Sequence, residues 1–396
     1  MRTGLLVRPR THPRRTASIS SPRRSGRVIE LDGLRGIATI AVLLSHFWRY
    51  PAGYEAINRF VRTGWVAIDL YLVLSGFLIT GILWDARHSL HYYRDFYVRR
   101  VLRIFPLYYA LLFVAFVLLP LHGVSPALRA VLDDRFLYLT YLANVAIVLH
   151  GWQLFALDIT WSLALEEQFY LAWPFVIRQM SIPALVGGLA SIVIVVPILR
   201  TVAWLGFNTG WMATHMLTVF RLDSLALGGL LALVVREGWL RPDLLRRLGS
   251  GILAVVGPIL ALLVATDHFR RDSMLVGTIG YSLLAVCFAA LLVCSVFPGR
   301  RLSQVLSHAG LCRLGVVSYG VYLAHPLCLM VVGTALATVG VELDNLTRWP
   351  LVSSIGAVLL PSACAYGVAE LSHRYFERPI LALQQPLRRG DAPLAH

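Results

Sequence analysis

The sequence predicts an all-α polytopic membrane protein with about ten transmembrane helices, and three observations support this prediction. Only 14% of the 396 residues are charged and 57% are hydrophobic, whereas a soluble domain carries about 25% charged residues. Apolar runs long enough to cross the ~30 Å hydrocarbon layer recur along the chain. Basic residues cluster between alternate runs, as expected for cytoplasmic loops. We therefore expect one membrane domain at 28–380, a disordered cytoplasmic arm at 1–27 and a cytoplasmic tail at 381–396.

Eleven segments have the hydropathy of candidate membrane helices. In chain order they are 29–48, 64–84, 102–121, 136–150, 160–177, 182–200, 216–235, 250–266, 275–297, 314–337 and 350–371. Segment 136–150 is the weakest of them, because a helix needs about 20 apolar residues to cross the membrane. Several prolines lie in or at the ends of these segments, where neighbouring helices can satisfy the freed backbone groups.

The arginines decide which of these segments span the membrane. All 36 basic residues are arginines, and the net charge is +15. If 136–150 does not span, the later arginine clusters face the same side as the Arg-rich arm; if it spans, they face outward, against the positive-inside rule. We therefore expect ten spans, both termini in the cytoplasm, and 136–150 re-entrant or interfacial. Because membrane topology and anionic lipid account for the basic charge, no nucleic-acid partner is expected.

The arm and the cysteines argue against a secreted, disulfide-linked protein. Residues 1–27 carry eight arginines, but the helix that follows lacks the small-residue cleavage site of a signal peptide. The five cysteines form no CxxC pair, and four of them lie in apolar runs. We therefore expect a retained arm, no disulfide framework and no metal site.

Ionisable residues inside membrane helices are costly and mark candidate functional sites. In the first helix, Arg35 and His46 are eleven residues apart, which places them on one face and about 16 Å apart along the axis. Arg35 is expected near the cytoplasmic end and His46 near the outer end. The alternative is an interfacial arginine and a histidine at the membrane boundary, neither with a chemical role.

The next two predicted helices contain one carboxylate, Asp69, and two arginines, Arg100 and Arg103. Asp69 is expected level with His46, where a carboxylate would orient the imidazole; the alternative is a structural Asp–Arg pair inside the bundle. Arg100 and Arg103 share a helix face at the cytoplasmic surface. Arginine binds phosphate through two donors at once, although ordinary positive-inside anchoring also explains this pair.

The later helices contain further polar groups. Glu166 and Glu167 lie in an apolar run and are expected in the outer half, near His46 and Asp69. Arg221 and Asp223 point to different faces and must find partners elsewhere. His325 is expected mid-membrane. The pattern suits either an enzyme that binds an anionic donor from the cytoplasm and acts on a hydroxyl in the outer half, or a proton-coupled transport path.

Seven motifs in order resemble those of the acyltransferase-3 family of membrane O-acyltransferases, over about residues 28–380. They are DGLRG with Arg35-x10-His46, AIDLYLVLSGFLIT, Arg100-x-x-Arg103-I-F-P, WSLALEEQFYLAWP, RLDSLALG, SYGVYLAHP and FERP. The resemblance implies a bacterial plasma-membrane enzyme that moves an acyl group, usually acetyl, from acyl-CoA to a hydroxyl. It implies acyl-CoA as co-substrate, with no permanently bound cofactor. Acceptors in the family include surface polysaccharide, lipopolysaccharide, peptidoglycan, Nod-factor sugars and macrolides.

The resemblance also suggests a role for each polar residue. Arg35, Arg100 and Arg103 would bind the phosphates of the donor, and Arg35 and His46 are essential in the family pattern. His46 would act as general base or carry the acyl group, with Asp69 or Glu167 orienting it. The remaining candidates are assigned to acceptor binding or support: Glu166, Trp161, Arg221, Asp223, Tyr319 and His325.

The chain departs from the family pattern in two places. Ala324 stands before the His-Pro pair where tryptophan is commoner, which bears on the shape of the acceptor pocket. No hydrolase-like domain follows the last predicted span, so we expect no acyl relay to such a domain in cis.

Three alternatives to envelope-sugar acylation remain open. In the first, the acceptor is a secreted small molecule such as a macrolide. In the second, the protein is a transporter or flippase, and in the third it is a non-catalytic scaffold. A transporter of the common type would show inverted repeats, and we find none in the sequence. A scaffold would not need Arg35, His46, Asp69 and Glu167 inside apolar helices.

Overall fold

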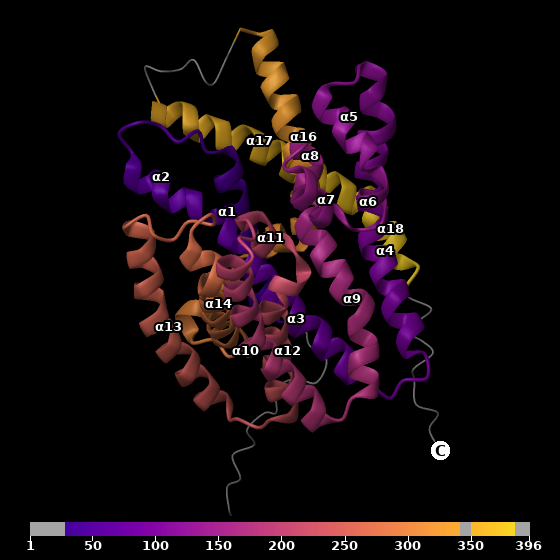
Figure 1. Cartoon of the computed structure of the whole chain (residues 1–396). Helices are drawn as coiled ribbons and strands as arrows, with labels where there is room; N and C mark the ends of the chain where they lie inside the picture. Colours follow the sequence, from indigo (N-terminus) through magenta and orange to yellow (C-terminus); the bar gives the residue numbers. More distant parts are fainter. Residues whose placement is uncertain (1–27, 341–349, 385–396) are drawn as a thin grey trace, which may run out of the picture.

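The computed structural model describes residues 28–340 and 350–384, and this part of the chain contains helices and loops but no strand. The helices form a single bundle (Figure 1), with α1 (Ile29–Phe47) and α3 (Ala67–Asp85) in its middle. Residues 1–27, which are the expected arm, residues 341–349 and residues 385–396 of the expected tail lie outside the described residues.

Within the described ranges, ten helices have sixteen or more residues, and they follow the expected segments closely. Besides α1 and α3 they are α4 (Tyr92–Phe113), α9 (Trp161–Gln179), α10 (Ile182–Gly206), α12 (Leu222–Glu237), α13 (Pro242–Ala265), α14 (Tyr281–Val296), α16 (Ala309–Thr338) and α17 (Pro350–Ser372). Turns of 3-10 or π helix continue α4 to His122, α14 from Val276 and α17 to Glu377.

Short helices connect the long ones. They are α2 (Glu55–Arg62), α5 (Pro126–Asp133), α6 (Arg135–Leu139), α7 (Ala143–His150), α8 (Phe155–Asp158), α11 (Trp211–Met216), α15 (Arg300–Leu306) and α18 (Arg378–Ala382). The weak segment 136–150 is therefore two helices, α6 and α7, of five and eight residues. Each is too short to cross the hydrocarbon layer alone.

Seven helical segments of the described chain are long and apolar enough to cross a membrane. They are 55–85, 92–122, 182–206, 242–265, 276–296, 309–338 and 350–382. Of the other long helices, α1 and α9 each contain three charged residues, and α12 has only sixteen residues. The chain is thus a multi-pass membrane protein, and its candidate site residues lie both on these three helices and on the apolar helices α3, α4 and α16.

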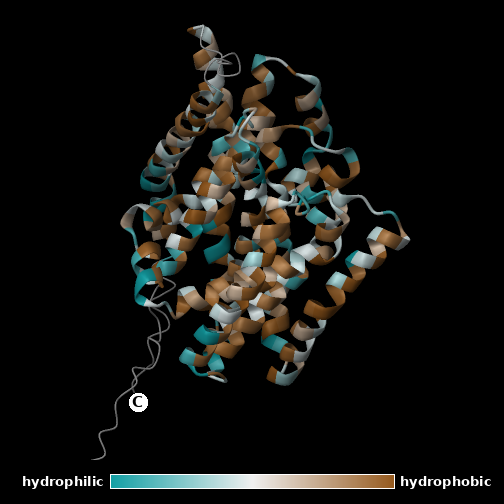
Figure 2. Cartoon of the chain, turned by 90° about the vertical axis from the view of Figure 1, so that its left-hand side faces the viewer, coloured by the Kyte–Doolittle hydropathy of each residue, from teal (hydrophilic) through white to brown (hydrophobic). Residues whose placement is uncertain are grey.

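The outer helices present apolar side chains to their surroundings. Apolar residues predominate along the helices and polar ones gather toward the loops (Figure 2). On α10 and α13 many large apolar side chains are exposed, including Ile194, Ile198, Val255 and Leu262. A soluble protein rarely leaves so large an apolar surface uncovered, whereas a lipid bilayer covers it.

Glycines allow two pairs of central helices to touch backbone to backbone. A Cβ atom added at Gly315 of α16 would lie 1.8 Å from the carbonyl oxygen of Asp32 in α1, and one at Gly76 of α3 would lie 2.0 Å from that of Leu225 in α12. Small residues of this kind permit close helix packing in membranes. The α1–α16 contact places His46 against α16, and the α3–α12 contact places Asp69 near the start of α12.

Candidate active site

Two histidines from distant parts of the chain form a hydrogen-bonded pair. The Nδ1 atom of His46, near the end of α1, lies 2.8 Å from Nε2 of His325 in α16. The Nδ1 atom of His325 lies 2.6 Å from the backbone carbonyl oxygen of Tyr322. His325 is fully buried, whereas His46 is exposed to the cavity described below.

These contacts assign the proton positions of the neutral pair. A carbonyl oxygen only accepts hydrogen bonds, so Nδ1 of His325 carries a proton and its Nε2 is an acceptor. The Nδ1 atom of His46 must then donate to it, which leaves Nε2 of His46 with a free lone pair. Nε2 of His46 can therefore act as a base, while Nδ1 holds the hydrogen bond to His325.

His46 lines a cavity of about 380 Å³, which is within the usual size range of small-molecule sites. Its walls are strongly aromatic, with Trp65, Trp161, Tyr322 and Phe155 among the lining residues. The Phe155 ring meets the His46 ring edge-on, with 5.4 Å between ring centroids. Trp161, predicted as a supporting residue, is therefore part of the same wall as His46.

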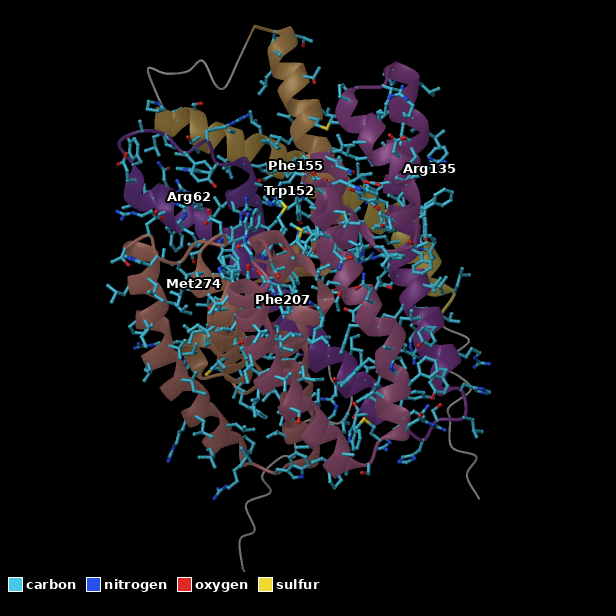
Figure 3. All side chains as sticks on the ribbon, viewed as in Figure 1. Arg62, Arg135, Trp152, Phe155, Phe207 and Met274 are labelled. Carbon is cyan, nitrogen blue, oxygen red and sulfur yellow. The ribbon has the colours of Figure 1, made fainter. Side chains whose placement is uncertain are left out.

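The loop before α9 is held by a buried carboxylate. Both oxygens of Asp158 accept from the backbone N–H of Gln153, and one also accepts from that of Leu154. Burial nonetheless raises the pKa of Asp158 above its usual value. These bonds fix the backbone beside Trp152 and Phe155, which are labelled close together in Figure 3 and both line the cavity.

Asp69 pairs with Arg221 at 2.5 Å, and both side chains are fully buried. Arg221 also donates to the backbone carbonyl of His215 at 3.0 Å, and His215 lines the cavity. The expected contact of Asp69 or Glu167 with His46 does not occur among the described residues, because His325 occupies that place. The alternative of a structural Asp–Arg pair is the arrangement that the structure shows for Asp69.

A second buried ion pair lies next to the first. Arg200 of α10 binds Asp223 at 2.8 Å, so Arg221 and Asp223 do find partners on different helices, as expected. His215 accepts at Nδ1 from the Tyr281 hydroxyl, 2.8 Å away. Burial and the positive charges of Arg221 and Arg271 hold the pKa of His215, on the short helix α11, well below its usual value. His215 is thus a neutral cavity residue that sequence reasoning missed.

Glu166 and Glu167 face the arginine cluster rather than His46. Glu166 accepts from the hydroxyls of Ser75 at 2.8 Å and Tyr170 at 2.9 Å. Arg100 lies over the Tyr170 ring, 5.2 Å from its centroid, and its charge acts on both glutamates. The expected position of this acidic pair beside His46 is therefore wrong: α9 carries both residues past the cavity, toward Arg100.

Three arginines gather at the end of α1 opposite His46. The charges of Arg35, Arg100 and Arg103 act on one another. Arg35 has Asp32 at 3.6 Å, while Arg100 and Arg103 form no carboxylate ion pair within the described chain. Arg103 is exposed. Asp32, Glu166 and Glu167 offset part of this positive charge. The exposed Arg103 has no carboxylate partner within the described chain and can therefore still bind an anion.

Two pairs of hydroxyl groups from different helices lie near α1. One turn after Arg35, the Thr39 hydroxyl lies 2.8 Å from the Tyr71 hydroxyl. Further along, the Tyr322 hydroxyl lies 2.8 Å from that of Ser162 and donates to the Ile159 carbonyl. Tyr319, one turn before Tyr322, instead donates to the Ile104 carbonyl and ties α16 to α4.

Comparison with known proteins gives a consistent result. A family model described as an acyltransferase domain matches residues 28–367. The chain is 28% identical to the peptidoglycan O-acetyltransferase OatA of Listeria monocytogenes, covering 89% of this chain and 56% of that protein. It is 29% identical to the putative peptidoglycan O-acetyltransferase YrhL of Bacillus subtilis, covering 88% and 54%. For the O-acetyltransferase OatA of Staphylococcus aureus the identity is 25%, covering 88% and 56%.

The chain thus spans about half the length of the curated relatives it matches. No solved structure matches it.

Proposed function

The chain belongs to the acyltransferase-3 family, and from this premise we propose that it transfers an acetyl group from acetyl-CoA to a hydroxyl of a cell-wall sugar polymer. The observation that carries the proposal is the arrangement along α1. An anion-binding arginine cluster lies at one end, and an unprotonated histidine nitrogen in a cavity lies at the other. The relatives, whose names specify O-acetyl transfer and peptidoglycan, support the acyl group and the acceptor class.

The proposed orientation places the arginine cluster at the cytoplasmic face of the bacterial plasma membrane and the His46 cavity toward the outside. It has ten spans, because the ten long helices all cross, and both termini are cytoplasmic. The positive-inside rule supports this choice. Segment 136–150 then lies in or along the outer face.

The donor would bind from the cytoplasm. Arg100, Arg103 and Arg35 would bind the phosphates of CoA, because two oxygens of one phosphate can accept hydrogen bonds from the two donors of a planar guanidinium fork. The pantetheine arm would extend along α1, and its length of about half a ~30 Å bilayer would bring the thioester to His46. Acetyl-CoA is a co-substrate in this scheme, and no permanently bound cofactor is needed.

The chemical step uses Nε2 of His46 as general base. As the acceptor oxygen attacks the thioester carbonyl, Nε2 takes the hydroxyl proton; when the C–S bond breaks, the CoA thiolate leaves and takes that proton as a thiol. General base catalysis contributes about 10²–10⁴-fold. In a covalent variant, Nε2 itself attacks the thioester, the C–S bond breaks and the CoA thiolate leaves. The acceptor hydroxyl then attacks the acetyl-imidazole, the C–N bond breaks to restore the neutral imidazole, and the hydroxyl proton passes to the CoA thiolate to give the thiol.

The decisive experiment measures transfer of labelled acetyl groups from acetyl-CoA to wall fragments by purified protein. His46→Ala should retain CoA binding and lose at least about 100-fold in turnover. Wild-type turnover by this variant would refute the mechanism. A labelled acetyl group trapped on His46 would select the covalent route.

The alternatives give different results in the same assay. A secreted small molecule such as a macrolide would be acetylated while wall fragments are not. A transporter or flippase would yield no acetylated product from either acceptor. The names of the peptidoglycan O-acetyltransferase relatives favour the wall polymer.

A further inference from the structure

Two adjacent arginines near the cavity differ sharply in their contacts. Arg270 pairs with Asp272 at 2.9 Å and with Asp267 at 3.7 Å. Its neighbour Arg271 forms no ion pair or hydrogen bond with any described residue. Instead the Arg271 guanidinium lies over two tryptophan rings, 5.0 Å from the centroid of Trp211 and 6.0 Å from that of Trp152. The rings position the cation, and no described residue accepts a hydrogen bond from its N–H donors.

Arg271 belongs to the reactive cavity. It lines the same cavity as His46, and its charge acts on both His46 and His215. No carboxylate of the described chain lies within ion-pair distance of it. A cation on a cavity wall that has free donors and no counterion attracts an anionic group of a ligand.

The cavity wall beside Arg271 suits a sugar ring. Trp152 is 41% exposed, and Trp65 and Trp161 line the same cavity. A pyranose presents an apolar face of C–H groups, which packs on an indole ring, and polar edges, which need a few well-placed donors. Because Asp158 fixes the loop that bears Trp152, this wall is formed before any ligand binds, which lowers the entropic cost of binding.

We propose that Arg271, Trp152 and Trp211 form an acceptor subsite that binds an anionic group, carboxylate or phosphate, on a sugar whose hydroxyl meets Nε2 of His46. The inference deepens the proposed function and rests on it. The subsite makes the enzyme selective for acidic glycans, and the anion orients the ring so that one hydroxyl faces the base. Neutral glycans of the same length are poor acceptors.

The test uses one preparation of wall glycan fragments in three forms: untreated, with carboxyl groups converted to amides, and with phosphate groups removed. The full-length protein is assayed for acetyl transfer to each form. Loss of a charge-assisted contact should lower wild-type kcat/KM by about 10- to 100-fold, mainly through KM, on the one form that lacks the recognised anion. The affected form identifies the anion as carboxylate or phosphate.

The Arg271→Gln variant should use all three forms with the low kcat/KM that the wild type shows on the form lacking the recognised anion. The Arg271→Lys variant should regain part of the preference for the forms that carry the anion. Arg270→Gln is the matched control, because it removes the same charge one residue away from an already paired arginine; it should behave as wild type. Equal use of all three forms by the wild type, or an undiminished preference in Arg271→Gln, would overturn the subsite.

A binding readout separates this inference from the proposed reaction. Because Trp152 and Trp211 lie against Arg271, bound fragments should change the intrinsic tryptophan fluorescence. If the protein binds the forms that carry the anion more tightly but transfers no acetyl group, the proposed reaction is refuted and the subsite is supported. Transfer without the preference would remove the subsite and keep the reaction.

Discussion

Replacing His325 by leucine should slow the reaction without weakening substrate binding. His325 is fully buried and reaches the cavity only through His46, to which it offers the Nε2 acceptor at 2.8 Å. Leucine has no acceptor, so either the Nδ1 proton of His46 remains unsatisfied or the proton moves to Nε2, which then has no lone pair to act as the base. A buried donor without a partner costs about 1–3 kcal/mol. If the transition state bears that cost, kcat falls by about 5- to 150-fold.

The control is His325→Gln, whose side-chain oxygen can accept from Nδ1 of His46 from nearly the same position. It should remain within about tenfold of the wild-type kcat. The assay determines kcat and the KM for acetyl-CoA on purified protein, after size-exclusion chromatography has confirmed equal folding. Wild-type kcat in a folded leucine variant would refute the assignment of proton positions, as would a folded glutamine variant no faster than leucine.

Three further predictions concern other parts of the bundle. Arg100→Gln combined with Arg103→Gln should raise the KM for acetyl-CoA by at least about tenfold, and unchanged CoA binding in equilibrium dialysis would remove the donor-site assignment. Gly315→Ala places a Cβ where the α1 backbone lies, so it should lower both the melting temperature and kcat, whereas Gly333→Ala on the same helix, with open space around its Cβ, should change neither. Asp69→Ala leaves its buried arginine partner without a counterion and should cost about 3–5 kcal/mol of stability, measured by thermal unfolding in detergent; an unchanged melting temperature would contradict the fully buried ion pair.

Most helices of this fold were predictable from the sequence, because hydropathy and length decide which segments cross a membrane. Segment 136–150 is an instructive case. Its apolar composition suggests a helix, and only the arginine distribution argues against a span. The structure shows two short helices there, since the chain turns at Thr140 and Tyr141 and Tyr141 adopts a positive φ of 57°. Nothing in the hydropathy predicts that turn.

The partners of the charged residues were harder to predict than the helices that carry them. Spacing along one helix correctly placed Arg35 and His46 at opposite ends of α1. It gives no information about which helix faces which, so Asp69 was paired with His46 rather than Arg221. The His46–His325 contact joins residues 279 positions apart and depends on glycines that bring α1 against α16. Arg271 and His215 lie outside long apolar runs, where a charged or polar residue is unremarkable.

The position of Arg35 and His46 on one helix has a consequence for donor choice. Because α1 is continuous from Ile29 to Phe47, it fixes a separation of about 16 Å along the helix axis between Arg35 at the anion site and His46 at the cavity. On the proposed mechanism, a donor must present its phosphates and its carbonyl at that separation. Acetyl phosphate, with its carbonyl next to its only anionic group, cannot reach both ends. A longer acyl chain does not change the distance between the phosphates and the thioester carbonyl. The length of α1 therefore selects the carrier, and the cavity beside His46 selects the acyl group.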